Sequence, residues 1–137
     1  MTMASAIDAL QRLLSVASHW RSSEDVGRAL DPLASDPNKV AAKARRDERI
    51  FAAWEGDRFH YPAFQFDADG QPRTLTPMLV RVLPRDASNT VGIEACLWVF
   101  QPDAALGGHA PADLFSQDPE RVIELARRRR HGSDADD

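Results

Sequence analysis

Apolar residues recur at helical spacing near the start of the chain and divide it into short amphipathic segments. A helix over about Ala4–Ala17 is predicted, since apolar residues fall three or four positions apart on one side. These residues are Ile7, Leu10, Leu14 and Ala17. A second, short helix is expected to run to about Leu30, because Ser22 or Ser23 can cap its first turn. Trp20 lies between the two segments and is expected to pack the joint between them.

The third segment has a strong helix-start signal. Asp36 can cap a helix whose first position is Pro37, a residue favoured there because the first-turn N–H groups have no partner in the helix. This helix is predicted to run to about Trp54, with Gly56 ending it. Its apolar side carries Val40, Ala44, Phe51 and Trp54.

Aromatic residues dominate the stretch that follows, over residues 58–73. Phe59–Phe66 alternates loosely and contains Pro62, which fits an edge strand or an irregular extended segment. The Asp67–Gly70 run is a turn signal, so we predict an extended arm or a short hairpin. Two interpretations are open: an edge that packs against a partner or lies beside DNA, and a hydrophobic strap that joins the two halves of the protein. We favour the strap.

The next part of the chain, residues 74–130, is predicted to form a small helical domain. Leu75–Leu83 has helical spacing, and its apolar face carries Leu75, Met78, Leu79 and Val82. Val91–Phe100 is almost wholly apolar, and its period alone does not separate a buried helix from a strand. We prefer a helix, because Val91, Ala95 and Trp98 align on one side.

A cap and a proline also open the last helix, at Asp118 and Pro119. Residues 131–137 are expected to be a disordered tail. The chain is therefore predicted to be mainly α. It divides into an N-terminal helical region over 1–57, an extended arm or hairpin over 58–73, a C-terminal helical domain over 74–130 and the tail.

Composition limits the class of protein. The chain has 137 residues, of which 43% are apolar, enough for a real core. Its net charge of −4 argues against a generally basic nucleic-acid coat protein, although a local basic patch remains compatible with it. Cys96 lies in the apolar run Val91–Phe100 and is expected to be a buried, unreactive thiol.

Signals for a membrane protein, a metalloprotein or an enzyme are missing from the sequence. Asp8 stands where a signal peptide would be basic, and no stretch approaches the roughly 20 apolar residues of a membrane helix, so we expect a cytoplasmic protein. We expect no metal or other cofactor, because the four histidines lie far apart without ligand spacing. We expect no enzymatic activity, because no nucleophile–base set and no glycine-rich phosphate loop is evident.

The second and third predicted helices have the order of a helix–turn–helix. In such a module the second helix enters the major groove of DNA and nearby cations meet phosphates. The candidate DNA-binding residues are Asn38, Lys39, Lys43, Arg45, Arg46 and Arg49. The alternative is an ordinary solvated face, because Asp47 and Glu48 offset these cations and the turn lacks the frequent glycine.

A framework of aromatic, proline and glycine residues runs from Trp98 to Phe115. It reads Trp98-x-Phe-x-Pro, then Leu106-x-Gly108-x-x-Pro111-x-Asp113-Leu114, and a helix with Val122 and Ile123 follows. Gly108 is expected to supply an unusual backbone angle, Pro111 to start a short helix and Asp113 to help cap it. This framework resembles the toxin-binding C-terminal domain of antitoxins of the Xre/MbcA/ParS type. Phe59–Gly70 is similar to a subgroup that joins this domain to an upstream helix–turn–helix.

The resemblance implies a protein that binds and blocks a cognate toxin, often a RES-domain enzyme that degrades NAD, and represses its own operon as a homodimer or larger assembly. It places the framework residues Trp98, Leu106, Pro111, Asp113 and Leu114 in shaping the domain. It places toxin contacts around the 107–112 loop and the last helix, at Gly107, Gly108, His109, Arg127 and Arg128. The alternative is an interaction adaptor or a transcriptional regulator without a toxin partner.

Overall fold

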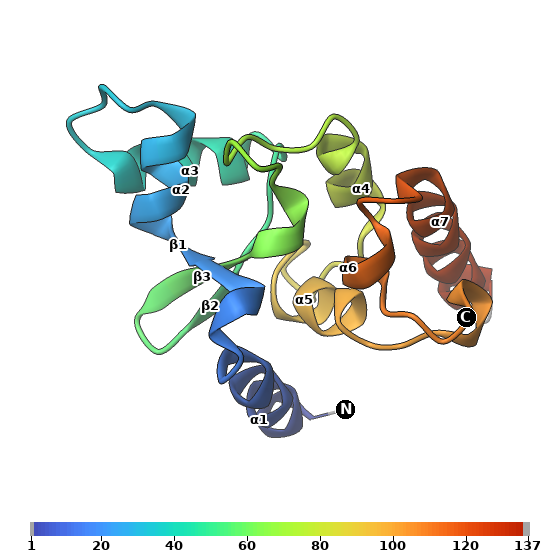
Figure 1. The fold of residues 1–137 in the computed structure, drawn as a ribbon. Helices are drawn as coiled ribbons and strands as arrows, with labels where there is room; N and C mark the ends of the chain where they lie inside the picture. The colour runs from blue at the N-terminus through green and yellow to red at the C-terminus, as the bar shows by residue number, and fades with distance from the viewer. Residues whose placement is uncertain (1, 136–137) are drawn as a thin grey trace.

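A computed structural model describes residues 2–135 and is mainly α, as the sequence predicts (Figure 1). Within these residues, α-helices surround a small antiparallel sheet. The helices are α1 Met3–Leu14, α2 Ser23–Leu30, α3 Pro37–Arg46, α4 Thr76–Val82, α5 Ile93–Val99, α6 Pro111–Leu114 and α7 Pro119–Ala135. The strands are β1 Trp20–Ser22, β2 Ala53–Glu55 and β3 Arg58–Pro62, and short 3-10 turns are η1 Ala17–His19, η2 Ala63–Gln65 and η3 Ala104–Leu106.

Helix α1 ends earlier than its apolar pattern predicts. The Ser15 hydroxyl donates to the carbonyl of Arg12, and the exposed Ala17 belongs to η1 rather than to the helix. The expectation for Trp20 is confirmed, because its indole N–H donates to the carbonyl of Leu13 at 2.9 Å. Leu10 is buried against the C-terminal half, where α1 packs on α5.

Helix α3 is eight residues shorter than predicted, since it ends at Arg46 and not at Trp54. Glu48 adopts a left-handed backbone with φ of 58°. Its N–H donates to the carbonyl of Arg45, and the N–H of Arg49 donates to that of Ala44. These two bonds form a Schellman motif, which usually places glycine at the left-handed position. Because Glu48 and not glycine occupies this position, the sequence carries no signal for the end of α3. The prediction that the helix runs to Trp54 was wrong.

The sheet has the order β1-β3-β2, so β3 is its central strand. Strands β2 and β3 form a hairpin whose two-residue turn, Gly56 and Asp57, has positive φ at both positions, as tight hairpins require. The predicted hairpin region was therefore placed too late in the chain. Asp67–Gly70 does form a turn, with the Asp67 carboxylate accepting from the N–H groups of Asp69 and Gln71.

Two groups of buried side chains lie on either side of one extended segment. Ile50 and Ala52 join a smaller core with α2 and α3, whereas Phe51 and Ala53 join the larger core of the C-terminal half. The ring of Phe64 contacts those of Phe51 and Phe115, with centroids 6.0 and 5.5 Å apart. These contacts agree with the strap interpretation.

Side-chain packing crosses the predicted boundaries at residues 57 and 73. Tyr61 and Phe66, within residues 58–73, are buried in the smaller core. Leu10 of the N-terminal region belongs to the larger core. The division itself stays a prediction.

The C-terminal helices form as predicted, with two corrections. Val91–Phe100 contains α5, whose Ala95, Cys96 and Val99 are buried. The buried face of α4 carries Leu79 and Val80. Met78, which was predicted to lie on the apolar face, is 45% exposed. The predicted disordered tail is wrong for residues 131–135, which continue α7; residues 136–137 lie outside the described part.

Candidate functional site

Helices α2 and α3 form a tightly packed helix–turn–helix-like pair. Ser22 caps α2 by accepting from the N–H of Asp25, and Asp36 caps α3 by accepting from that of Lys39. The helices approach so closely that a Cβ atom on Gly27 would lie 1.8 Å from the carbonyl oxygen of Pro37. The turn between the two helices lacks the glycine that is frequent in helix–turn–helix modules. The glycine here is Gly27 of α2, which lies against Pro37 at the start of α3.

The candidate DNA-binding residues separate into two groups. Asn38, Lys39, Lys43 and Arg46 are exposed on α3, whereas Arg49 is exposed beyond the end of the helix. Lys43 pairs with Asp47 at 2.7 Å. Its hydrogen bond is the main cause that holds the pKa of Asp47 below the ordinary aspartate value. The Asp47 carboxylate thus offsets the charge of Lys43 on the exposed face of α3.

Arg45 belongs to the packing between α3 and the sheet. Its guanidinium lies over the ring of Phe59, 3.6 Å from the centroid, and donates to the hydroxyl of Tyr61 at 2.7 Å. Such a stacked and hydrogen-bonded guanidinium is held in one orientation. Arg45 therefore fixes α3 on the hairpin, and the expectation that it contacts DNA stays a prediction.

The Trp98–Phe115 framework folds into a closed turn followed by α6. The N–H of Asp103 donates to the carbonyl of His109, and the N–H of Gly108 donates to that of Asp103. Gly107 and Gly108 have φ of 66° and 86°, so the expected unusual backbone angle is confirmed. Leu106 is buried beneath the turn.

The remaining framework residues divide between structure and surface. Pro111 is the first residue of α6, as predicted, and Leu114 packs against the larger core. The capping role assigned to Asp113 is wrong, because α6 has no side-chain cap and this residue is exposed. Asp103 instead caps η3, because its carboxylate accepts from the N–H of Ala105 at 2.8 Å.

Asp103 also ties the turn to α7. Both of its carboxylate oxygens lie 3.0 Å from the Nη2 atom of Arg129. The N–H of Ala105 and then the Arg129 guanidinium hold the pKa of Asp103 below its ordinary value. Arg121 adds a second tie, because it donates to the carbonyl of Ala105 at 2.9 Å.

The Asp103–Arg129 pair predicts a specific pH dependence. Because the folded pKa is lowered, the pair stabilises the fold above the unfolded pKa of about 3.9. This contribution is lost as the pH falls through the folded value. Asp103→Asn keeps an acceptor for Ala105 but removes the charge, so it should cost about 1 kcal/mol or less near neutral pH. Unfolding free energies at pH 7 and pH 3 test this: the cost should shrink at pH 3, and an equal cost at both would contradict it.

A groove of about 650 Å³ lies beside this turn, between α5, α7 and the α4–α5 loop. Trp98, Gln101 and Pro102 line it from the end of α5. Arg129 and Arg130 line it from α7. Arg85, from the α4–α5 loop, completes a lining rich in guanidinium groups.

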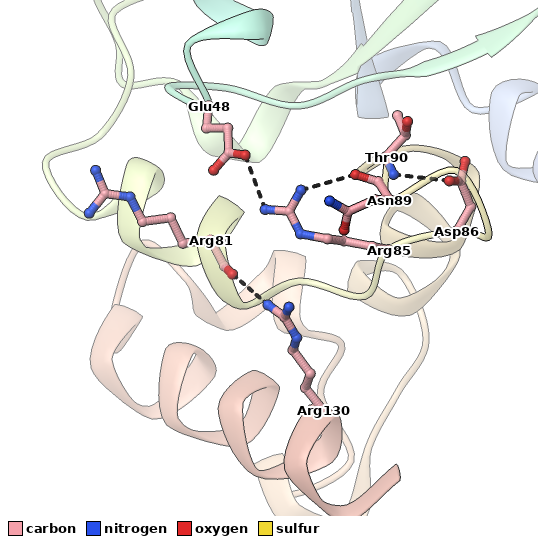
Figure 2. Close-up of polar contacts among 7 residues, drawn as sticks. All are labelled: Glu48, Arg81, Arg85, Asp86, Asn89, Thr90 and Arg130. Atoms are coloured by element: carbon pink, nitrogen blue, oxygen red, sulfur yellow. Dashed lines mark hydrogen bonds and ion pairs between the residues drawn. The ribbon is translucent and has the colours of Figure 1, made fainter. Parts of the chain in front are cut away.

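Figure 2 shows how Arg85 and Arg130 connect separate parts of the fold. Arg85 donates to Glu48, after α3, and to the carbonyl of Asn89, both at 3.2 Å. Arg130 donates to the carbonyl of Arg81 in α4 at 2.8 Å, while the side chain of Arg81 points away (Figure 2). The groove is thus assembled from segments distant in the chain, and no local motif reveals Arg85.

The residues expected to contact a toxin come from two segments, the closed turn and α7. Gly107, Gly108 and His109 are exposed on the closed turn. Arg127 pairs with Glu124 one turn earlier on α7, and Arg128 is exposed. Arg129 and Arg130, which follow, are the members of the basic run that line the groove.

Other candidate chemistry is accounted for by packing. Cys96 is fully buried, and burial raises the pKa of its thiol. His19 stacks on Phe100, and His60 hydrogen-bonds the carbonyl of Glu55. Within residues 2–130, whose side chains the structure describes, no three His, Cys, Asp or Glu side chains gather as metal ligands. None of the helices within residues 2–135 is both long and apolar enough to cross a membrane.

Comparison of the chain with models of protein families, with curated proteins and with solved structures finds no match.

Proposed function

We propose that this protein is an antitoxin of a type II toxin–antitoxin system. It binds a cognate toxin through the turn at 103–110 and the adjoining groove, and it blocks the toxin's active site sterically. The observation that carries the proposal is the geometry around Trp98. The closed turn exposes Gly107, Gly108 and His109, and Asp103 at the start of that turn lines the groove together with Arg129 and Arg130.

The Trp98–Leu114 framework supports the same proposal. Its residues resemble the toxin-binding domain of Xre/MbcA/ParS-type antitoxins, and they follow one another on α5, the η3 turn and α6. A RES-domain toxin is the partner that the resemblance favours.

Operator binding through α2 and α3 is the second half of the proposal. A helix pair with close packing at Gly27 presents Asn38, Lys39, Lys43 and Arg46 on the outer side of α3. The protein then represses its own operon, as a homodimer or larger assembly that matches paired half-sites.

Reversing two charges on α3 tests the separation of the two surfaces. Lys43→Glu with Arg46→Glu should weaken operator binding about tenfold or more and flatten its salt dependence, because each lost phosphate contact lowers the slope by about one. Toxin neutralisation should persist. Mobility shifts over a salt series and a growth assay measure the two effects. Two single charge reversals are compared as a matched control. Arg46→Glu alone should weaken operator binding, whereas Arg12→Glu, at an exposed residue of α1, should not. Equal loss of both functions would contradict two separate surfaces.

A protein-interaction adaptor without a DNA role is the second candidate. Local compensation of charge favours it, because Asp47 pairs with Lys43, and Arg45 is held against the sheet. Unchanged DNA binding in the double charge reversal would support this candidate.

A further inference from the structure

We propose that the groove between α5 and α7 binds an acidic segment of the protein partner, whose carboxylate pairs with Arg130 beside Trp98. This inference rests on the proposed function, because it names the chemistry of the toxin segment that the antitoxin receives. It also makes a prediction that needs no toxin.

Arg130 and Trp98 both place hydrogen-bond donors in the groove lining. Arg130 forms no ion pair with any side chain of residues 2–130, and its guanidinium donates to the carbonyl of Arg81. The indole N–H of Trp98 has no acceptor in the same part of the chain, whereas that of Trp20 has one. Carboxylate oxygens accept from both kinds of donor, and their bonds to guanidinium groups are strong.

The position of each acidic side chain shows where such a carboxylate fits. Asp103 is already engaged by Arg129 and by the N–H of Ala105. Glu94 lies one helical turn before Trp98 on the same side of α5 and lines the groove too. A second carboxylate is repelled near Glu94, so the acidic group of the partner belongs on the α7 side of Trp98.

The rest of the lining suits a peptide chain. Trp98 is half-buried against the larger core, and Pro84 and Pro102 also line the groove. Apolar surface of this kind packs against the side chain next to the carboxylate. A volume of about 650 Å³ accommodates a few residues of a protein but not the backbone of a DNA duplex.

Titration of the full chain with a tetraglutamate peptide, followed by NMR of the tryptophan indole groups, tests the proposal. The indole signal of Trp98, assigned by its loss in Trp98→Phe, should shift with added peptide. The signal of the exposed Trp54 should stay in place. Tetraglutamine should produce no shift. Arg130→Gln should weaken the titration about fivefold, and Arg12→Gln, the matched change at an exposed arginine of α1, should leave it unchanged.

Three results would overturn the proposal: no Trp98 shift, an equal shift with tetraglutamine, or a larger Trp98 shift with a short DNA duplex. Binding of the neighbouring gene product separates this inference from the proposed function. If that product binds wild type, Arg130→Gln and Arg12→Gln equally, the antitoxin proposal stands and the groove proposal fails. If it does not bind but tetraglutamate shifts Trp98, the groove proposal stands and the antitoxin proposal fails.

Discussion

Replacing Gly27 with alanine is expected to destabilise the protein by about 3 kcal/mol, the upper end of the cost of overpacking. The added Cβ would meet backbone atoms of Pro37, with the carbonyl oxygen only 1.8 Å away. A flexible side chain could move aside, but the first turn of a capped helix cannot move without disturbing α3. The better helix propensity of alanine returns only about 1 kcal/mol.

Chemical denaturation of the Gly27→Ala variant measures this effect. Arg28→Ala is the matched control, since it alters the next residue of α2 but removes only an exposed ion pair with Glu24. That control should cost less than about 1 kcal/mol. Because the substitution displaces α3, operator binding should fall as well. Wild-type stability in Gly27→Ala would mean that the two helices do not approach as closely as described.

Replacing Gln65 with leucine is expected to cost about 3 kcal/mol or more, although both side chains have similar volumes. The Gln65 side chain is fully buried and accepts from the N–H of Phe51 at 2.9 Å. It also donates to the carbonyls of Phe51 and Pro62 at 2.8 and 3.0 Å. Leucine leaves these three backbone groups buried without partners, and each such group costs about 1–3 kcal/mol.

Unfolding free energies of Gln65→Leu and Gln65→Glu separate lost hydrogen bonds from lost packing. The glutamate variant should recover stability as the pH falls, because a protonated carboxyl keeps one donor and carries no buried charge. Gln71→Leu is the control, since the Gln71 side chain is half-buried and donates once, to the carbonyl of Ala29. It should cost about 1 kcal/mol. If Gln65→Leu also lowered the unfolding free energy by only about 1 kcal/mol, the role of Gln65 in joining β3 to the segment before β2 would be contradicted.

Sequence reasoning located most helices because their start signals are local. Asp36 with Pro37 begins α3, Ser22 caps α2, and Pro119 begins α7, each as predicted. The ends of the helices were harder to predict from the sequence. The end of α3 depends on Glu48 in a left-handed conformation, a role for which its residue type gives no signal.

The sheet and the groove were harder to predict, because their residues meet only in three dimensions. Strand β1 is three residues long and pairs with β3 about forty positions later, so no periodic pattern marks it. Arg85 and Arg129 come from opposite ends of the C-terminal half. The exposed cations of α3 were identifiable from the sequence, but the contact of Arg45 with Phe59 was not, because it depends on where the hairpin folds back.

Co-expression with the product of the adjacent gene tests the antitoxin proposal most directly. The neighbour is expressed alone and with this protein, growth is followed, and the tagged protein is purified to see what it retains. We expect the neighbour to arrest growth alone, and to be captured and silenced when both are present. A neighbour that is harmless alone and does not co-purify would contradict the proposal.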